Sequence, residues 1–345
     1  MARWLTFGSS GEEPVALPRR SSRACTEPPL HSPGGLFLSG FAQRRFGVVT
    51  AAGMLAGVFV ACDAPGRDVK ARATVGRAET PYVIDHFGDT VRVRPAARIV
   101  SMMPASTEIL FAIGAGERLV GRSEFDKWPD SALAVPNLGP GLRPNVEALL
   151  AAKPDLVILY ASQDNRGAAR RLREAGIATA AFKLDSIEQF DRLTRLLGRL
   201  TGNASRGDLV ADTVMRTLDS VRALTRTLPR VSVVMPAYEQ PFLVIGGGSF
   251  MSQLVEIAGG RNIYDSIPQP SPAVAFEDVI RRNPDAVLAP PDYAETLRRS
   301  SRWQALAAVR RGRVLMLDTA VVYRPAVRLG EGAVSLAKLL HPELR

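Results

Sequence analysis

Histidine and cysteine, which supply many catalytic bases, nucleophiles and metal ligands, are sparse in this sequence. The 345 residues include His31, His86, His341, Cys25 and Cys62, and these are far apart. No GxSxG elbow is present, and the run GGGS at 246–249 lacks the lysine of a phosphate-binding loop. We therefore expect no catalytic set and no metal centre, and we interpret 246–249 as a tight turn from a strand into a helix.

The residues whose spacing does invite an interpretation are two glutamates. Glu147 lies in NVEALLAAKPDLVIL (145–159), and Glu277 lies in AFEDVIRRNPDAVLA (275–289). The proline and the aspartate that follow each glutamate also match: Pro154 with Pro284 and Asp155 with Asp285. An acidic residue in the first turn of a helix stabilises the helix dipole by roughly 0.3–1 kcal/mol, which explains either glutamate alone but not their equivalent positions.

Each copy of this segment predicts a short helix, a break at proline and a buried strand. Apolar residues recur at helical spacing before the proline, which cannot continue a helix. The apolar run after it is typical of a parallel strand that is covered on both faces. Two copies in one chain predict two similar lobes. The fold class is therefore α/β, with two Rossmann-like lobes joined by a long connecting helix and a ligand cleft between the lobes.

The rest of the chain is assigned around these copies. Residues 46–61 are sixteen uncharged residues, which is short for a membrane span and typical of the core of a signal peptide. Cys62 follows small residues and is expected to be lipidated; an uncleaved N-terminal anchor is the alternative. The predicted segments are a disordered leader or over-extended start (1–43), a lipoprotein-type signal (44–62), a tether (63–80), an N-terminal lobe (81–185), the connecting helix (186–228) and a C-terminal lobe (229–345).

Loops after the buried strands carry the candidate ligand residues. In open α/β sheets, ligands bind beyond the carboxyl ends of the strands. There the sequence places mainly aromatic residues and arginines, which suit a bulky, partly apolar and anionic ligand. The candidates are Phe125, Trp128, Arg143, Tyr160, Tyr238, Tyr323 and Arg324. A helix is predicted to start at Pro104, with the polar residues up to Glu108 suited to its free N–H groups.

The formal net charge of +10 comes from basic residues, mostly arginines, that are scattered along the chain. No block of Lys or Arg with interleaved aromatic residues appears, so a nucleic-acid partner is not expected. A solvated basic surface explains most of the charge, and an anionic ligand is compatible with it.

Several segments together resemble the class III periplasmic binding proteins, which deliver cobalamin, iron-siderophores or haem to ABC importers. They are RIVSMMPASTEILFAIGAGERLVG (98–121), PNVEALLAAKPDLVIL (144–159), GGGSFMSQLVEIAGGRNIY (247–264), FEDVIRRNPDAVLA (276–289) and WQALAAVRRGRVLMLD (303–318). The resemblance implies a non-enzymatic, monomeric binding protein in the periplasm or on the exterior of the cell envelope. It also implies that Glu147 and Glu277 pair with arginines of a dimeric permease.

The resemblance constrains the ligand less than the fold. Haem binders of the family often carry a tyrosine where this chain has residues 139–143, GPGLR, and cobalamin binders often use tryptophans where it has residues 321–324, VVYR. These departures and the two arginines favour a ferric siderophore or a similar anionic chelate, with cobalamin as the second candidate. The only covalent group expected is the lipid on Cys62.

Two other functions remain open at this point. A ligand sensor of the same fold would dock on a signalling partner instead of a permease. An envelope α/β enzyme would use carboxylates such as Glu147 or Asp126, but no base and nucleophile accompany them.

Overall fold

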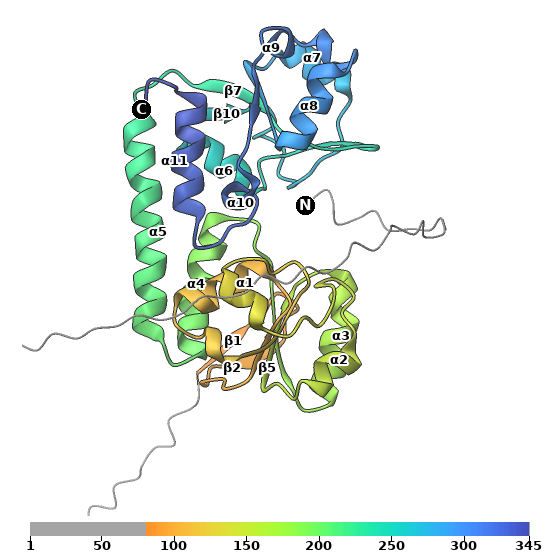
Figure 1. The fold of residues 1–345 in the computed structure, drawn as a ribbon, viewed down its shortest axis with the longest axis vertical. Coiled ribbons are helices and arrows are strands. Elements are labelled where there is room, and N and C mark those ends of the chain that lie inside the picture. Colours follow the sequence, from red (N-terminus) through yellow and green to blue (C-terminus); the bar gives the residue numbers. More distant parts are fainter. Residues whose placement is uncertain (1–80, 345) are drawn as a thin grey trace, which may run out of the picture. The chain divides into compact units, whose positions relative to one another are not determined.

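The computed structural model describes residues 81–344 (Figure 1). The predictions for the leader, the signal, the tether and Cys62 fall outside the described residues. Among residues 81–344, no helix is both long enough and apolar enough to cross a membrane.

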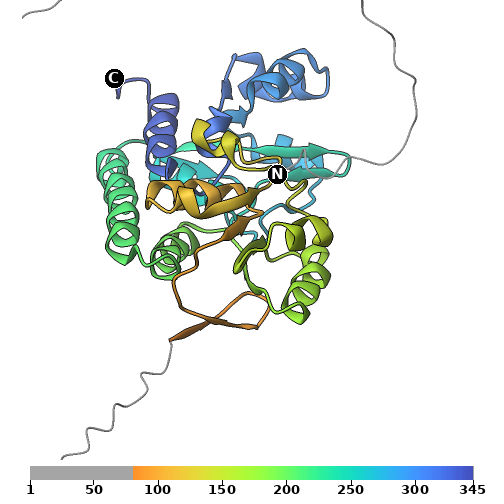
Figure 2. The same cartoon turned by 60° about the horizontal axis from the view of Figure 1, so that its bottom comes forward.

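The N-terminal lobe is built on a four-stranded sheet in which every pairing is parallel. The strand order is β4-β3-β5-β6. Its elements are β1 (Tyr82–Ile84), β2 (Thr90–Arg92), β3 (Ile99–Ser101), α1 (Pro104–Ala112), β4 (Leu119–Arg122), α2 (Val146–Ala151), β5 (Leu156–Tyr160), α3 (Gln163–Glu174) and β6 (Ala178–Phe182). Strands β1 and β2 pair as an antiparallel hairpin (Figure 2, orange).

The C-terminal lobe repeats this sheet with the order β10-β7-β11-β12, again parallel throughout. Strand β3 therefore corresponds to β7, β4 to β10, β5 to β11 and β6 to β12. The elements are β7 (Val231–Val234), β8 (Pro236–Glu239), β9 (Phe242–Val244), α6 (Phe250–Ile257), β10 (Gly260–Asn262), α7 (Phe276–Arg282), β11 (Ala286–Ala289), α8 (Pro291–Arg299), α9 (Ala307–Arg310), β12 (Val314–Met316), α10 (Thr319–Val322) and α11 (Leu329–Leu340).

The C-terminal lobe also contains a feature that the sequence analysis did not predict. An antiparallel hairpin, β8–β9, lies between β7 and α6. In the N-terminal lobe, β3 leads into α1 after only two residues. The turn at 246–248, predicted as a tight entry to a helix, follows β9 and precedes α6.

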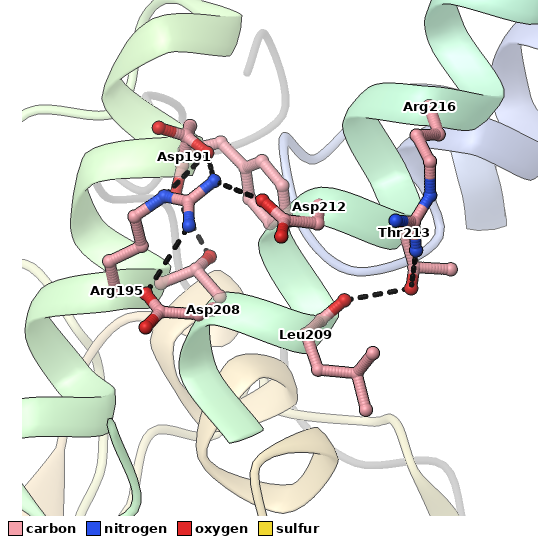
Figure 3. A network of polar contacts seen from close by, with 9 residues as sticks. Asp191, Arg195, Asp208, Leu209, Asp212, Thr213 and Arg216 are labelled. Atoms are coloured by element: carbon pink, nitrogen blue, oxygen red, sulfur yellow. Dashed lines mark hydrogen bonds and ion pairs between the residues drawn. The ribbon is translucent and has the colours of Figure 1, made fainter. Parts of the chain in front are cut away.

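The connecting segment was predicted as one long helix over 186–228, but it consists of two helices, α4 (Ile187–Leu200) and α5 (Ala204–Thr225). The chain turns between them at Gly202, which has φ 71°. The helices approach closely at two glycines: a Cβ on Gly198 would lie 3.0 Å from the Cα of Gly207. Arg195 on α4 links them further, because it forms ion pairs with Asp191 at 2.9 Å, Asp208 at 3.2 Å and Asp212 at 2.6 Å (Figure 3).

The connector joins the cores of the two lobes. One cluster of buried apolar residues runs from α1 through α4 and α5 to α6 and α11, and each lobe has a second core of its own. Helix α4 packs on α1, and α5 packs on α6 and α11 (Figure 1). At the start of α4, the backbone N–H of Ile187 donates to Oε1 of Gln253 on α6 at 2.9 Å. The lobes therefore share packing as well as a connection.

Candidate functional site

Buried polar side chains line the carboxyl end of the N-terminal sheet, where β3 passes into α1. Ser101 Oγ lies 2.6 Å from Ser106 Oγ, and Thr107 Oγ1 donates to Ser101 Oγ at 2.8 Å. These three hydroxyl side chains are completely buried. The N-cap of α1 is Met103, which makes no side-chain hydrogen bond. The prediction that polar side chains cap this helix is therefore wrong, because they turn inward and satisfy one another.

The same network fixes the loop that follows β4. Asp126 is fully buried and hydrogen-bonds to the hydroxyls of Ser123 and Thr107. Burial raises the pKa of Asp126 above its ordinary value, and the hydrogen bonds from Ser123 and Thr107 oppose that rise. The loop is thus anchored from inside, and Phe125 and Trp128 stand on either side of that anchor.

The C-terminal lobe reaches this region through the segment that follows α10. Arg324 Nε lies 3.0 Å from Oε1 of Glu108 on α1, and the guanidinium of Arg328 lies 5.5 Å from the ring centre of Trp128. Two predicted ligand residues, Trp128 and Arg324, therefore lie on opposite sides of one junction between the lobes. We call the set Glu108, Asp126, Trp128, Arg324 and Arg328 the junction cluster.

Glu108 is the most unusual residue of the junction cluster. It is only 3 % exposed, although it is ionisable. Burial raises its pKa to about 7, while Arg324 and then Arg328 oppose that rise. Desolvation therefore outweighs the attraction of two guanidinium groups, as is common where charges leave water.

Two other predicted residues, Arg143 and Tyr160, are linked through Asn165. The buried amide of Asn165 donates to the carbonyl of Tyr160 at 2.9 Å and accepts from the backbone N–H of Arg143 at 3.0 Å. The Arg143 side chain pairs with Asp164 at 3.1 Å and is 79 % exposed. The Tyr160 hydroxyl donates to Asp185 at 3.0 Å, and burial, followed by the charge of Asp185, raises its pKa.

The remaining predicted ligand residues are half-buried tyrosines of the C-terminal lobe. Tyr238 lies on β8, and Tyr323 follows α10 directly before Arg324. Burial, and then the charge of Asp292, raises the pKa of Tyr323 to about 12. Tyr323 therefore stays neutral at physiological pH and packs against the shared core.

Both repeated glutamates are exposed in the first turns of equivalent helices, Glu147 on α2 and Glu277 on α7. The Asn145 side chain already accepts from the backbone N–H of Glu147 at 3.0 Å and of Ala148 at 3.3 Å. Helix α2 is therefore capped without the carboxylate of Glu147, which leaves that carboxylate available at the surface.

Sequence reasoning missed Glu108, Arg328 and Asn165. The signal for Glu108 was a charged residue directly before the apolar run Ile109–Phe111, which a helix must bury on one face. Asn165 is a similar polar residue on the buried face of α3. Within residues 81–344, no group of three or more His, Cys, Asp or Glu could hold a metal ion.

Comparison with known proteins identifies the class. Residues 99–321 match the periplasmic binding protein family, and the chain belongs to it. It is 25 % identical over 314 residues to an uncharacterized ABC transporter substrate-binding lipoprotein, YvrC of Bacillus subtilis, with 87 % of this chain and 98 % of that protein covered.

Solved structures agree with this assignment. The periplasmic vitamin B12 binding protein BtuF of Vibrio cholerae superposes with a TM-score of 0.64 at 25 % identity, covering 71 % of this chain and 97 % of BtuF. The periplasmic heme-binding protein RhuT of Roseiflexus sp. RS-1 gives a TM-score of 0.65 at 24 % identity, covering 72 % and 100 %, and supports the fold alone.

These findings confirm the predicted family and the two-lobed α/β fold. The protein is a substrate-binding protein of an ABC transporter. Its relatives are binding proteins without enzymatic activity, so the carboxylate-dependent enzyme is set aside.

Proposed function

We propose that this protein captures an anionic metal chelate at the junction between its lobes and delivers it to an ABC permease. The observation that carries the proposal is the meeting of Arg324 with Glu108 and of Arg328 with Trp128 across the lobes. Arginine binds carboxylate and other anionic oxygens through several donors at once, and tryptophan offers a large apolar face. A ferric siderophore supplies both anionic oxygens and aromatic or aliphatic surface.

Cobalamin is the second candidate ligand. The relative in Vibrio cholerae is named a vitamin B12-binding protein, and the solved structure of BtuF is close in fold. Trp128 provides a surface for a large macrocycle. The arginines of the junction cluster favour the anionic chelate over it.

A titration of the purified full chain tests the ligand. Trp128 lies in the junction cluster, so binding should change tryptophan fluorescence. We expect saturable binding of ferric enterobactin or of cyanocobalamin, and at least a tenfold weaker affinity for the ferric chelate in Arg324→Ala. A chain that binds neither compound nor haem would contradict the proposed ligand class.

Docking on the permease is assigned to Glu147 and Glu277. Two exposed carboxylates at equivalent places on the two lobes define two points of contact and therefore an orientation. Glu147→Ala combined with Glu277→Ala should abolish uptake and leave ligand affinity unchanged. A control with Glu117→Ala and Glu256→Ala removes one exposed glutamate from each lobe and should retain uptake. Normal uptake by the first variant would contradict the assignment.

The proposal includes a monomer that is held outside the cytoplasmic membrane by a lipid on Cys62. The lipoprotein YvrC supports this anchoring. Mass spectrometry of protein extracted from membranes should find the lipid on a peptide that begins at Cys62. An unmodified Cys62 in the mature protein would overturn the lipid anchor.

A further inference from the structure

A buried glutamate and an arginine face each other across the lobes without completing a hydrogen bond. The side chain of Glu108 is 4 % exposed, whereas that of Arg324 is 31 % exposed. Nε of Arg324 is buried and, among the described residues, has no hydrogen-bond partner. The contact with Glu108 at 3.0 Å is therefore an ion pair of imperfect geometry.

Stability alone is a weak explanation for this pair. Removing two charges from water costs several kcal/mol per ion, which only excellent geometry offsets. An apolar pair of the same size would join the lobes at least as well. The hydrogen-bonding capacity of Arg324 is also not fully used. Part of its guanidinium remains accessible, and its buried Nε has no hydrogen-bond partner among the described residues.

The charged groups that act on Glu108 come from two segments of the chain. Arg324 and Arg328 approach it from the segment after α10, and Asp126 acts on it from the loop after β4. Arg328 is itself paired with the exposed Glu331 at 3.1 Å and lies over Trp128. Arg324 is therefore the first counter-charge of Glu108, and within residues 81–344 no second carboxylate forms an ion pair with Arg324.

We propose that Glu108 holds Arg324 in place while the protein is empty and releases it to an anionic group of the ligand, taking up one proton in the exchange. This inference rests on the proposed function. The guanidinium remains protonated and exchanges one carboxylate for another anion. The carboxylate of Glu108 loses its nearest positive partner, binds a proton from solvent and becomes a neutral acid in its buried position. No covalent bond changes except the O–H bond formed on Glu108.

The exchange makes affinity depend on pH in one direction. With Arg324 beside it, Glu108 has a pKa of about 7, and loss of Arg324 as a partner raises that pKa further. Below about pH 7 the carboxyl group of Glu108 is already protonated, so ligand binding takes up little more than a small fraction of a proton. Above that value binding requires a proton, and affinity falls with rising pH by up to about tenfold per unit. A neutral ligand has no anion to exchange and should show no such dependence.

The test uses the full chain and two probes, trianionic ferric enterobactin and a neutral ferric trihydroxamate. Calorimetric titrations at pH 6.5, 7.5 and 8.5, in buffers of different ionisation enthalpy, give both affinity and proton uptake. For ferric enterobactin we expect uptake approaching one proton at pH 7.5 and about a five- to tenfold loss of affinity between pH 7.5 and 8.5.

Glu108→Gln removes the competing carboxylate and keeps the shape of the side chain. This variant should bind ferric enterobactin about thirtyfold more tightly than the wild type at pH 8.5, without proton uptake or pH dependence. Glu331→Gln removes the exposed carboxylate beside Arg328 and should behave as the wild type. The proton count on the wild type needs no variant, so a poorly folding Glu108→Gln does not prevent the test.

The outcomes separate this inference from the proposed function. Binding of ferric enterobactin without proton uptake, or with equal pH dependence in the wild type and Glu108→Gln, overturns the inference and leaves the ligand class standing. Loss of binding in a folded Glu108→Gln also overturns it, because Glu108 would then serve the bound state. Failure of both probes, and also of cyanocobalamin and haem, to bind the wild type overturns the ligand class and this inference together.

Discussion

The two lobes share one strand order, but different groups form the edge of each lobe that faces the ligand loops. By this edge we mean the region between the first central strand, β3 or β7, and the helix that follows it, α1 or α6. In the N-terminal lobe, buried hydroxyls and the carboxylate of Asp126 form this edge. In the C-terminal lobe, backbone groups at 246–248 do so: the N–H of Gly247 donates to the carbonyl of Ile267 at 2.8 Å, and that of Gly246 donates to Pro270 at 3.0 Å. A Cβ on Gly247 would lie 1.8 Å from the carbonyl oxygen of Asp265.

This difference separates two tasks. The N-terminal lobe holds the ionisable groups Glu108 and Asp126, whose pKa values are raised by burial. The C-terminal lobe presents Arg324 and Arg328 on a segment between α10 and α11. Common topology therefore places the loops, and local side-chain chemistry decides what each lobe can do.

We expect the largest loss of stability from a substitution in the glycine turn at 246–248 of the C-terminal lobe. Gly247→Ala forces a methyl group against a backbone carbonyl and should destabilise the protein by about 3 kcal/mol. Gly167→Ala is the control: it lies inside α3, no atom lies within 4 Å of its Cβ position, and the change should stabilise by about 0.5–1 kcal/mol. Urea unfolding midpoints measure both. Similar values for the two variants would show that close approach at Gly247 is unimportant.

The next largest loss of stability is expected from a substitution in the buried polar network of the N-terminal lobe. Asp126→Ala leaves buried hydroxyls without an acceptor and should cost about 2 kcal/mol, with Asp126→Asn costing less. The pKa of Asp126 is raised in the folded protein, so its contribution to stability decreases as pH rises from about 4 through that raised value. Asp126→Asn should remove this slope from a series of urea titrations. An unchanged slope would assign the pH response to another group.

Much of this architecture could be predicted from the sequence, because the repeated segments carry strong local signals. The break at Pro154 and Pro284 and the apolar runs after them gave the correct helices and strands, α2 and β5, α7 and β11. The hairpin β8–β9 was missed, since it is stabilised by pairing with register shifts that no local pattern encodes.

The junction cluster was harder to predict than the lobes. Trp128 and Arg324 were selected by residue type and by their position after a strand. Glu108 was assigned to helix capping, because its partner Arg324 lies 216 residues away in the chain and only the packing of the lobes brings them together. Burial and long-range charge, the two causes of its shifted pKa, are invisible in local sequence.

A smaller effect concerns the repeated aspartates, which have the same structural role in both lobes. Asp155 accepts from the backbone N–H of Ala97 at 2.8 Å, and Asp285 accepts from the N–H of Ser232 at 2.9 Å. Each carboxylate thus ties its strand to the beginning of the neighbouring one. Alanine at either position should cost about 1–1.5 kcal/mol, measured by urea unfolding.

The contribution of Asp285 to stability should change with pH in the opposite direction to that of Asp126. Hydrogen bonds from Ser232 lower the pKa of Asp285, so its stabilisation is complete above about pH 4 and is lost as pH falls through the lowered value. Asp285→Asn should therefore flatten the loss of stability in acid. A variant that retains the wild-type acid slope would show that other carboxylates dominate it.

The smallest effect compares the residues directly before the repeated prolines. Lys153 has φ 48° and Asn283 has φ 45°, so both copies turn through the left-handed region at the same place. Asparagine tolerates this conformation better than lysine does. Lys153→Asn should stabilise the protein by about 0.5 kcal/mol, and Asn283→Lys should destabilise it by a similar amount. Thermal unfolding of both variants and of the double exchange tests this. If the lobes are equivalent here, the two effects cancel in the double exchange, and a net change would mean that one of the two turns has additional constraints.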